Sequence, residues 1–301
     1  MPMESGLKPD LEPLLKLPKI ADGKETGALI RRALAEDVGA GDATTGALVP
    51  SSARATAVVV SRGNYVVSGT TVGMAVFKTV CHRLSVRVLI KDGQRVRRNG
   101  VVMTVSGSAA AILTAERTAL NFMQRMTGIA TMTAGFVDRV RRFGVTILDT
   151  RKTTPGLRML EKYAVLCGGG SNHRIGLYDR VLIKDNHRFL WNRTHEGDLG
   201  AAVLAARKKN CGLAVEIEVE NEKELISALR GLPEWILLDN MKPAAIRRCV
   251  KLCAGRSRLE ASGGITAAKV AAIAGTGVDA ISLGCLTHSA PAADLSLEIE
   301  Q

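Results

Sequence analysis

Aromatic residues are scarce in this sequence, and long apolar runs are absent from it. Phe, Trp and Tyr make up 3% of the 301 residues, which leaves few side chains for the stacking platforms that hold single-stranded nucleic acids. No stretch reaches the roughly 20 consecutive apolar residues that a membrane-spanning helix needs. Residues 1–10 also lack the basic flank and the apolar centre of a secretory signal. We therefore expect a cytoplasmic protein that does not contact membranes.

Cysteine is also sparse, and its spacing argues against disulfide staples and metal-binding motifs. No two cysteines form a CxxC pair, and the chain is long enough to build a core without cross-links. Cys249 and Cys253 lie four residues apart on a predicted helix, which is a spacing seen in half of a metal site. No second Cys or His pair completes that site, so we interpret both as packing residues. We expect reduced thiols at all six positions, Cys81, Cys167, Cys211, Cys249, Cys253 and Cys285.

Acidic residues are outnumbered, because 41 Lys and Arg face 29 Asp and Glu and give a formal net charge of +12. This excess predicts an anionic partner, which by charge alone is a nucleic acid, a membrane surface or a small phosphate. The cations are spread along the chain without a basic arm, and neighbours such as Arg31 and Arg32 are typical of solvated helix surface. We therefore favour small anionic substrates and expect no nucleic-acid binding.

The first part of the chain predicts a small α/β sandwich domain over residues 1–128. A short helix at residues 29–36 precedes β-branched runs at 55–61 and 85–90. Residues 91–93 and 98–100 read as turns, because their Gly and Asn tolerate positive φ. Apolar residues at near-helical spacing then predict one long helix over residues 109–126.

The pattern changes from about residue 144 to short apolar strands that alternate with helices, which is typical of a parallel sheet. No GxGxxG motif opens any unit, so a dinucleotide-binding fold has little support. We predict an incomplete TIM-like α/β barrel as the catalytic domain, residues 129–287. The six predicted strands are residues 145–150, 180–184, 214–219, 235–239, 258–262 and 280–284, and the helices are residues 157–166, 199–209, 222–229, 244–253 and 267–274.

Each predicted strand ends in charged, polar or glycine residues, and an α/β barrel builds its active site at those ends. The strand ends are residues 149–154 (DTRKTT), residues 184–187 (KDNH), the acids Glu216, Glu218 and Glu220, the pair Asp239 and Asn240, the run Ser262-Gly263-Gly264, and Gly284. Six such endings are hard to attribute to chance. The sequence therefore predicts a polar site at one rim of the barrel.

The three glutamates alternate with apolar residues, so the strand pleat points them to one face. Buried carboxylates need compensating cations or a metal, and Arg151, Lys152 and Lys184 converge on the same rim. Structural salt bridges inside a barrel are the alternative interpretation.

Two further segments have the composition of anion-binding loops. Ser262-Gly263-Gly264 and Gly284 end the last two strands, where many barrels hold a phosphate on backbone N–H groups. Three glycines at 168–170 precede His173 and Arg174 and allow close approach of a backbone or a ligand. The planar guanidinium group of Arg174 suits bidentate binding of carboxylates. A flexible linker and a structural histidine are the alternatives for this second segment.

Taken together, ordered blocks over nearly the whole chain resemble the quinolinate phosphoribosyltransferases, also called nicotinate-nucleotide pyrophosphorylases. The blocks are Glu36-Asp37 with Gly41-Asp42, residues 116–121 (ERTALN), residues 128–131 (GIAT), residues 149–158 (DTRKTTPGLR), residues 162–165 (KYAV) with the glycine loop through Arg174, and residues 184–187 (KDNH). Their order makes the resemblance far more specific than any single block.

The resemblance implies an N-terminal domain that packs on an incomplete barrel and is rejoined by the C-terminal tail, residues 288–301. It implies a homodimer in which Arg117 enters the partner's site. It also implies that Arg151, His173 and Arg174 bind the quinolinate carboxylates, and that Lys152 and Lys184 face the substrates' negative charge. Glu218 and Asp239 match an acidic pair for the ribose hydroxyls and Mg²⁺, and Ser262, Gly263, Gly264 and Gly284 match phosphate contacts.

The expected activity is transfer of the ribose of phosphoribosyl pyrophosphate to quinolinate, giving nicotinate mononucleotide, pyrophosphate and CO2 for de novo NAD biosynthesis. Lys152, Lys184, Glu218 and Asp239 are the expected catalytic residues. The nearest alternative is a related phosphoribosyltransferase for another planar acid or heterocycle. A Schiff-base aldolase that uses Lys152 or Lys184 is a second alternative, and a basic nucleic-acid-binding protein is a third.

Overall fold

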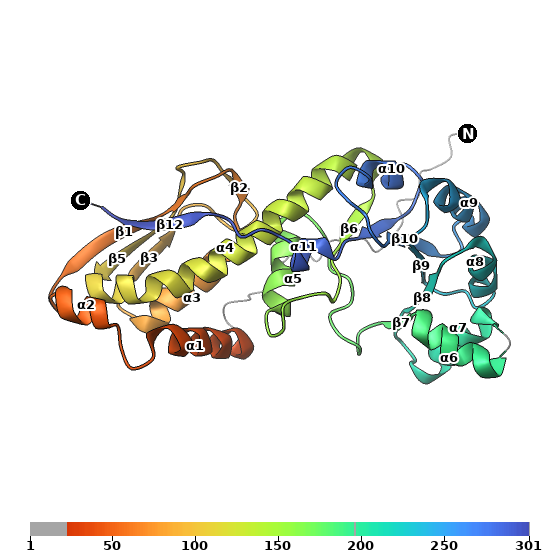
Figure 1. Cartoon of the computed structure of the whole chain (residues 1–301), viewed down its shortest axis with the longest axis horizontal. Helices are drawn as coiled ribbons and strands as arrows, with labels where there is room; N and C mark the ends of the chain where they lie inside the picture. Colours follow the sequence, from red (N-terminus) through yellow and green to blue (C-terminus); the bar gives the residue numbers. More distant parts are fainter. Residues whose placement is uncertain (1–22, 196, 301) are drawn as a thin grey trace, which may run out of the picture.

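The computed structural model describes residues 23–195 and 197–300, and its first part is built on a four-stranded antiparallel sheet in the order β12-β1-β5-β3 (Figure 1). The strands are β1 (Arg54–Ser61), β3 (Ser85–Val88), β5 (Val101–Ser108) and β12 (Leu295–Ile299). A ribbon of β2 (Tyr65–Val66) and β4 (Arg95–Val96) lies beside the sheet. The helices are α1 (Lys24–Val38), α2 (Ala43–Leu48), α3 (Thr70–Val80) and α4 (Ala109–Val140).

The two predicted turns of this part are present, and one of them also caps a helix. Gly93 and Asn99 have positive φ, at 86° and 65°, as tight turns require. The carboxylate of Asp92 accepts hydrogen bonds from Gly69 N at 3.1 Å and Thr70 N at 2.9 Å. These N–H groups at the start of α3 have no partner within the helix, so the turn fixes where α3 begins.

The long helix predicted over residues 109–126 is α4, but its predicted end was wrong, because α4 continues to Val140. The glycine inside it explains the error, since Gly normally weakens a helix. A Cβ atom at Gly128 would lie 2.0 Å from the carbonyl oxygen of Pro291. Gly128 therefore lets the C-terminal tail cross α4 in contact with its backbone. The helix also runs across the predicted domain boundary at residue 128.

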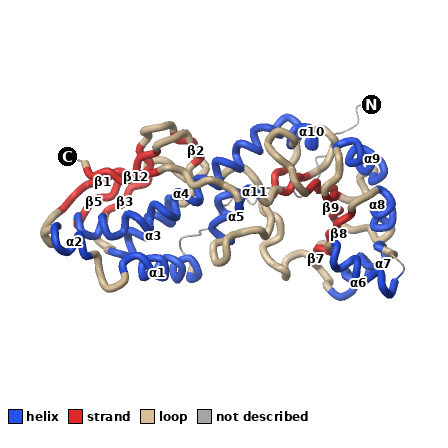
Figure 2. The backbone as a smooth tube through the Cα atoms, in the orientation of Figure 1, coloured by secondary structure: helices blue, strands red, loops and turns tan. Residues whose placement is uncertain are grey.

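The second part contains a six-stranded parallel sheet in the order β6-β11-β10-β9-β8-β7. Figure 2 shows strands of this sheet in red, among them β7, β8 and β9, with blue helices on their outer side. Consecutive strands β6 and β7 form its two edges, and in the described residues they do not pair with each other. Only an isolated bridge between Leu148 and Ser171 continues the sheet beyond β6. The expected incomplete α/β barrel with a smaller N-terminal α/β domain is confirmed.

The six barrel strands lie within the ranges predicted from the sequence. They are β6 (Thr146–Leu148), β7 (Val181–Ile183), β8 (Val215–Val219), β9 (Trp235–Asp239), β10 (Arg258–Ser262) and β11 (Ala280–Ser282). The helices between them are α5 (Arg158–Cys167), α6 (Asp185–His195), α7 (Leu199–Lys209), α8 (Glu222–Leu229), α9 (Pro243–Cys253), α10 (Val270–Ala274) and α11 (Cys285–His288), and the short 3₁₀ helix η1 (Arg141–Phe143) follows α4.

The C-terminal tail returns to the first sheet, where β12 pairs antiparallel with β1 in the register Ala57 to Ile299.

Cys249 and Cys253 are buried in α9 and belong to no group of potential metal ligands among the described residues. All six thiols are free. No helix in the described ranges is long and apolar enough to span a bilayer.

Candidate functional site

A cavity of about 930 Å³ lies at the carboxyl ends of the barrel strands, in the size range of ligand sites of 300–1,000 Å³. Eleven of the twelve residues that the sequence analysis assigned to substrate binding line it: Arg151, Lys152, His173, Arg174, Lys184, Glu218, Asp239, Ser262, Gly263, Gly264 and Gly284. They come from the ends of β6, β7, β8, β9, β10 and β11 and from the loop before β7. The twelfth, Arg117, is exposed on α4 and lies outside the cavity of its own chain.

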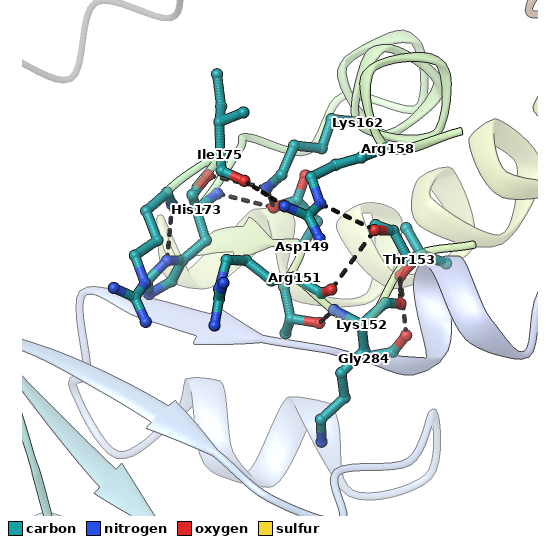
Figure 3. A network of polar contacts seen from close by, with 12 residues as sticks. Asp149, Arg151, Lys152, Thr153, Arg158, Lys162, His173, Ile175 and Gly284 are labelled. Atoms are coloured by element: carbon teal, nitrogen blue, oxygen red, sulfur yellow. Dashed lines mark hydrogen bonds and ion pairs between the residues drawn. The ribbon is translucent and has the colours of Figure 1, made fainter. Parts of the chain in front are cut away.

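Arg151 and Lys152 occupy the loop that follows β6, and neighbouring threonines fix its backbone (Figure 3). Thr150 Oγ1 accepts from Lys152 N at 3.1 Å, and Thr287 Oγ1 donates to the carbonyl of Lys152 at 2.7 Å. A Cβ atom at Gly284 would lie 3.0 Å from Lys152 Cδ. The absence of a side chain at Gly284 therefore leaves room for the lysine.

Arg174 is a buried cation of the cavity wall. Its side chain is 7% exposed, and its guanidinium donates to the carbonyl of Arg180 at 3.1 Å. Burial lowers the pKa of Arg174, and the nearby charge of Arg151 lowers it further. Two arginines that repel each other in a partly desolvated pocket form a site for an anion with more than one negative group.

His173 is engaged by the protein at both ring nitrogens. Nδ1 accepts from the backbone N–H of Arg174 at 2.7 Å, so Nε2 carries the proton and faces Glu216 Oε2 at 3.1 Å. Glu260 Oε2 lies 3.5 Å from the same nitrogen. The potential ligand atoms of these three buried residues lie within 4.8 Å of one another. Because Nε2 is needed as a donor, the local geometry favours a hydrogen-bonded cluster over metal binding there.

Glu218 and Asp239 face each other at the ends of β8 and β9. Burial raises the pKa of Glu218, and the charge of Asp239 raises it further, with Lys184 acting in the opposite direction. Asp239 also accepts a hydrogen bond from the side chain of Asn240 at 2.8 Å. Two oxygen-bearing groups whose negative charges oppose each other fit a hard divalent cation such as Mg²⁺.

The Ser262-Gly263-Gly264 segment turns sharply at the end of β10, where only glycine fits. Gly263 has φ of 92°, and a Cβ atom there would lie 2.3 Å from the side-chain oxygen of Asn240. The hydroxyl of Ser282 donates to that of Ser262 at 2.9 Å. Strands β10 and β11 thus present hydroxyl and backbone groups side by side, as phosphate sites of barrels do.

The expectation that three glutamates share one face was wrong for Glu220. Strand β8 ends at Val219, and Glu220 turns away to pair with Arg188 of α6 at 2.9 Å. Glu216 lies beneath the cavity, and Glu218 lines it.

Gly168 and Gly170 allow the glycine loop to pack closely against helix α4. Cβ atoms at these two positions would lie 2.5 Å from Ala130 O and 2.8 Å from Thr133 Cγ2 of α4.

The sequence analysis missed several residues of the cavity wall, among them Glu260 and His288. Glu260 lies two positions before Ser262 on β10, so the period of two that was applied to β8 would have pointed it inward. His288 lies one helical turn after Gly284, on α11. A helix of four residues gives no periodic signal, so nothing in the local pattern marks His288.

Comparison with known proteins gives the same result over both parts of the chain. Residues 42–127 match the N-terminal domain of quinolinate phosphoribosyl transferase, and residues 129–298 match its C-terminal domain. A nicotinate-nucleotide pyrophosphorylase (carboxylating) of Mycobacterium leprae is 43% identical, covering 90% of this chain and 95% of its own. A probable one of Bacillus subtilis is 39% identical, with 90% and 92% covered.

Among solved structures, the nicotinate-nucleotide pyrophosphorylase of Francisella tularensis has the same fold, with a TM-score of 0.87 at 37% sequence identity. The match covers 93% of this chain and 99% of that one. Sequence, fold and the convergent cavity agree. The chain belongs to the quinolinate phosphoribosyltransferase family.

Proposed function

We propose that this protein is a decarboxylating quinolinate phosphoribosyltransferase of de novo NAD biosynthesis. It transfers the ribose 5-phosphate of phosphoribosyl pyrophosphate to the ring nitrogen of quinolinate, and it forms nicotinate mononucleotide, pyrophosphate and CO2. The observation that carries the proposal is the charge pattern of the cavity. Paired arginines form one wall, and an acidic pair flanked by a lysine forms another. These walls match a dicarboxylate on one side and a pyrophosphorylated sugar on the other.

The pyridine dicarboxylate would bind against Arg151 and Arg174. Guanidinium groups bind carboxylates in bidentate geometry, and two of them suit two adjacent carboxylates. His173 belongs to the same wall. With both of its ring nitrogens occupied, we assign it to the support of Arg174. Arg117 of a second subunit would complete the wall, which makes the active enzyme a homodimer.

The sugar substrate would bind across the ends of β8 to β11. Glu218 and Asp239 would accept hydrogen bonds from the ribose hydroxyls and hold Mg²⁺, directly or through water or substrate. Ser262, Gly263, Gly264 and Gly284 would contact the phosphate groups through hydroxyl and backbone N–H groups. Lys152 and Lys184 would neutralise the pyrophosphate. When bound, Mg²⁺ would supply additional positive charge to the leaving group.

The reaction requires mainly that the two substrates are held in position and that the developing charges are stabilised. The ring nitrogen attacks C1 of the ribose as pyrophosphate leaves, and nearby carboxylates stabilise the positive charge that develops on the sugar. The nitrogen becomes cationic on bond formation. That positive charge stabilises the electron pair left on the ring when the adjacent carboxylate departs as CO2, so no separate cofactor is needed for decarboxylation. A cytoplasmic enzyme with small soluble substrates is consistent with the absence of a spanning helix in the described residues.

One assay tests this function. Purified protein is given phosphoribosyl pyrophosphate with either quinolinate or nicotinate, with and without Mg²⁺, and both the mononucleotide and CO2 are measured. We expect product and CO2 in equal amounts from quinolinate, dependence on Mg²⁺, and no turnover of nicotinate. Turnover of nicotinate, or of another planar acid, without turnover of quinolinate would identify a related phosphoribosyltransferase instead.

A further inference from the structure

Helix α5 carries three consecutive polar residues that are buried, although they point in different directions. Glu161 and Lys162 are each 1% exposed, and Tyr163 is 5% exposed. Ionised groups are rarely buried unless they are paired and hydrogen-bonded. The three residues contact three different parts of the molecule, so α5 connects segments that are distant in the sequence.

Lys162 is hydrogen-bonded to the backbone of His173 (Figure 3). Its Nζ lies 2.5 Å from Asp149 Oδ1 and donates to the carbonyl oxygen of His173 at 2.9 Å. Asp149 Oδ1 in turn accepts from the backbone N–H of His173 at 2.9 Å. The buried ion pair therefore engages both polar groups of the His173 backbone. It connects the end of β6, which leads to Arg151, to the loop that carries Arg174.

Residues beside Lys162 on α5 fix the other end of the Arg151 loop. Glu161 accepts from Thr154 N at 3.1 Å and from Thr154 Oγ1 at 2.8 Å. At the start of the helix, Arg158 donates to Thr153 Oγ1 at 3.1 Å and to the carbonyl of Ile175 at 3.0 Å. One helix thus contacts both cation-bearing loops at several points.

The two loops need such a support because their charges oppose each other. Burial lowers the pKa of Arg174, and the charge of Arg151 lowers it further because the two guanidinium groups repel each other. Burial raises the pKa of Asp149 to about 6, and the charge of Lys162 opposes that rise. Lys162 is not part of the cavity wall in the described structure, so it reaches substrate only through the loops.

We propose that Lys162, paired with Asp149, is a positioning residue that sets the separation of Arg151 and Arg174 before the dicarboxylate binds. The inference rests on the proposed function, because it assigns these arginines to quinolinate. Loops fixed in advance lower the ordering cost of binding. The effect should therefore be larger for the dicarboxylate, whose two assigned arginines both lie on these loops, than for the sugar substrate, which has Lys152 on one of them and its other assigned contacts elsewhere.

Steady-state kinetics of the full-length Lys162→Met enzyme test the proposal, together with calorimetric titration of quinolinate. We expect KM and Kd for quinolinate to rise about tenfold or more, as misplacement of a binding group by a fraction of an ångström produces. KM for phosphoribosyl pyrophosphate and kcat should change less than about threefold. Tyr163→Phe is the matched control, because it removes the neighbouring hydrogen bond to Asp92 and touches neither cation loop. Its KM for quinolinate should stay at the wild-type value.

Lys162→Met leaves Asp149 buried without its cation, and this variant can fail to fold. The double variant Asp149→Asn/Lys162→Met removes both charges and covers that case, and its KM for quinolinate should also be raised. A folded variant with wild-type KM for quinolinate overturns the proposal. An equal rise in KM for both substrates, together with a lower melting temperature, also overturns the proposal. Wild-type protein that neither binds nor converts quinolinate refutes the proposed function and this inference with it.

Discussion

Glu260 is a fully buried carboxyl group without a strong cationic partner. It is 0% exposed, and among the described residues neither carboxyl oxygen accepts a hydrogen bond of good geometry. The ionisable groups that face it are Glu216 on β8, Arg180 before β7 and His173 in the preceding loop, and Ser282 on β11 adds a hydroxyl. Arg180 and His173 both contact Glu216. Burial and the charge of Glu216 raise the pKa of Glu260 well above its usual value.

Glu260→Gln should therefore stabilise the protein at neutral and alkaline pH. A carboxyl group whose pKa is raised by folding contributes most to stability below its unfolded pKa, and it loses that contribution as pH rises toward the folded value. Glutamine does not titrate. The stability advantage of the variant should thus grow from about pH 4.5 upward, with a midpoint of thermal unfolding at least about 2 °C above wild type at pH 8.

Unfolding curves at pH 5 and pH 8 measure this difference, and Glu216→Gln provides the matched control. Glu216 is the partner of His173 at 3.1 Å and of Arg180 at 3.3 Å, so its replacement should destabilise the protein at pH 8. Lower stability of Glu260→Gln at pH 8 would mean that Glu260 is ionised and stabilising in the fold.

At the scale of single elements, the turn after β10 is the most constrained segment of the cavity. Gly263→Ala should lower the free energy of unfolding by about 1–3 kcal/mol, because a side chain at positive φ is strained and would contact Asn240. It should also raise KM for phosphoribosyl pyrophosphate more than KM for quinolinate, since the turn is assigned to phosphate.

Gly212→Ala separates backbone strain from the effect on the site. Gly212 has a similar φ of 89°, and no atom lies within 4 Å of a Cβ built there. This variant should show the loss of stability without the change in KM. Denaturant unfolding and steady-state kinetics measure both effects, and equal KM changes in the two variants would remove the turn from the phosphate site.

Elements with a strong local signal were the ones that sequence predicted well. Strands β9 and β10 have the predicted bounds because their apolar runs end in polar residues. Helix α6 was not predicted, since Phe189 and Leu190 on it are 67% and 60% exposed and give no buried apolar stripe. Strand β12 was not predicted as a strand, because its partner β1 lies more than 200 residues earlier.

The candidate site was predicted from the polar residues at the carboxyl ends of the barrel strands. This rule finds residues at strand ends, but it does not find residues that reach the site through tertiary contacts. It found residues such as Glu218 and Asp239, which lie at the ends of parallel strands. It could not find the support for the loops that carry Arg151 and Arg174. Lys162 appeared only within a block of the family resemblance, because its partners Asp149 and His173 meet it through tertiary packing alone.

At the scale of the whole molecule, the position of Arg117 bears on how many subunits form one site. It is exposed on α4 and outside the cavity of its own chain. We predict that Arg117→Ala is folded and inactive, and that Lys152→Ala is inactive as well. The reassembled mixture of the two variants should regain about a quarter of wild-type activity, because about half of the dimers are mixed and each mixed dimer has one intact site of two.

Unfolding and reassembly of the two variants together, followed by the activity assay, measure this recovery. Each variant reassembled alone is the control and should remain inactive. Mixed dimers, verified by differently tagged subunits, that show no activity would place Arg117 outside the shared site.

The position of strand β12 affects how the protein folds during synthesis. It forms an edge of the first sheet, yet it follows its partner β1 by more than 200 residues. During synthesis β1, β3 and β5 emerge long before β12, so the sheet gains this edge only after the elements of the second part have been made. A truncation that removes β12 would therefore leave β1 of the first sheet with an unpaired edge.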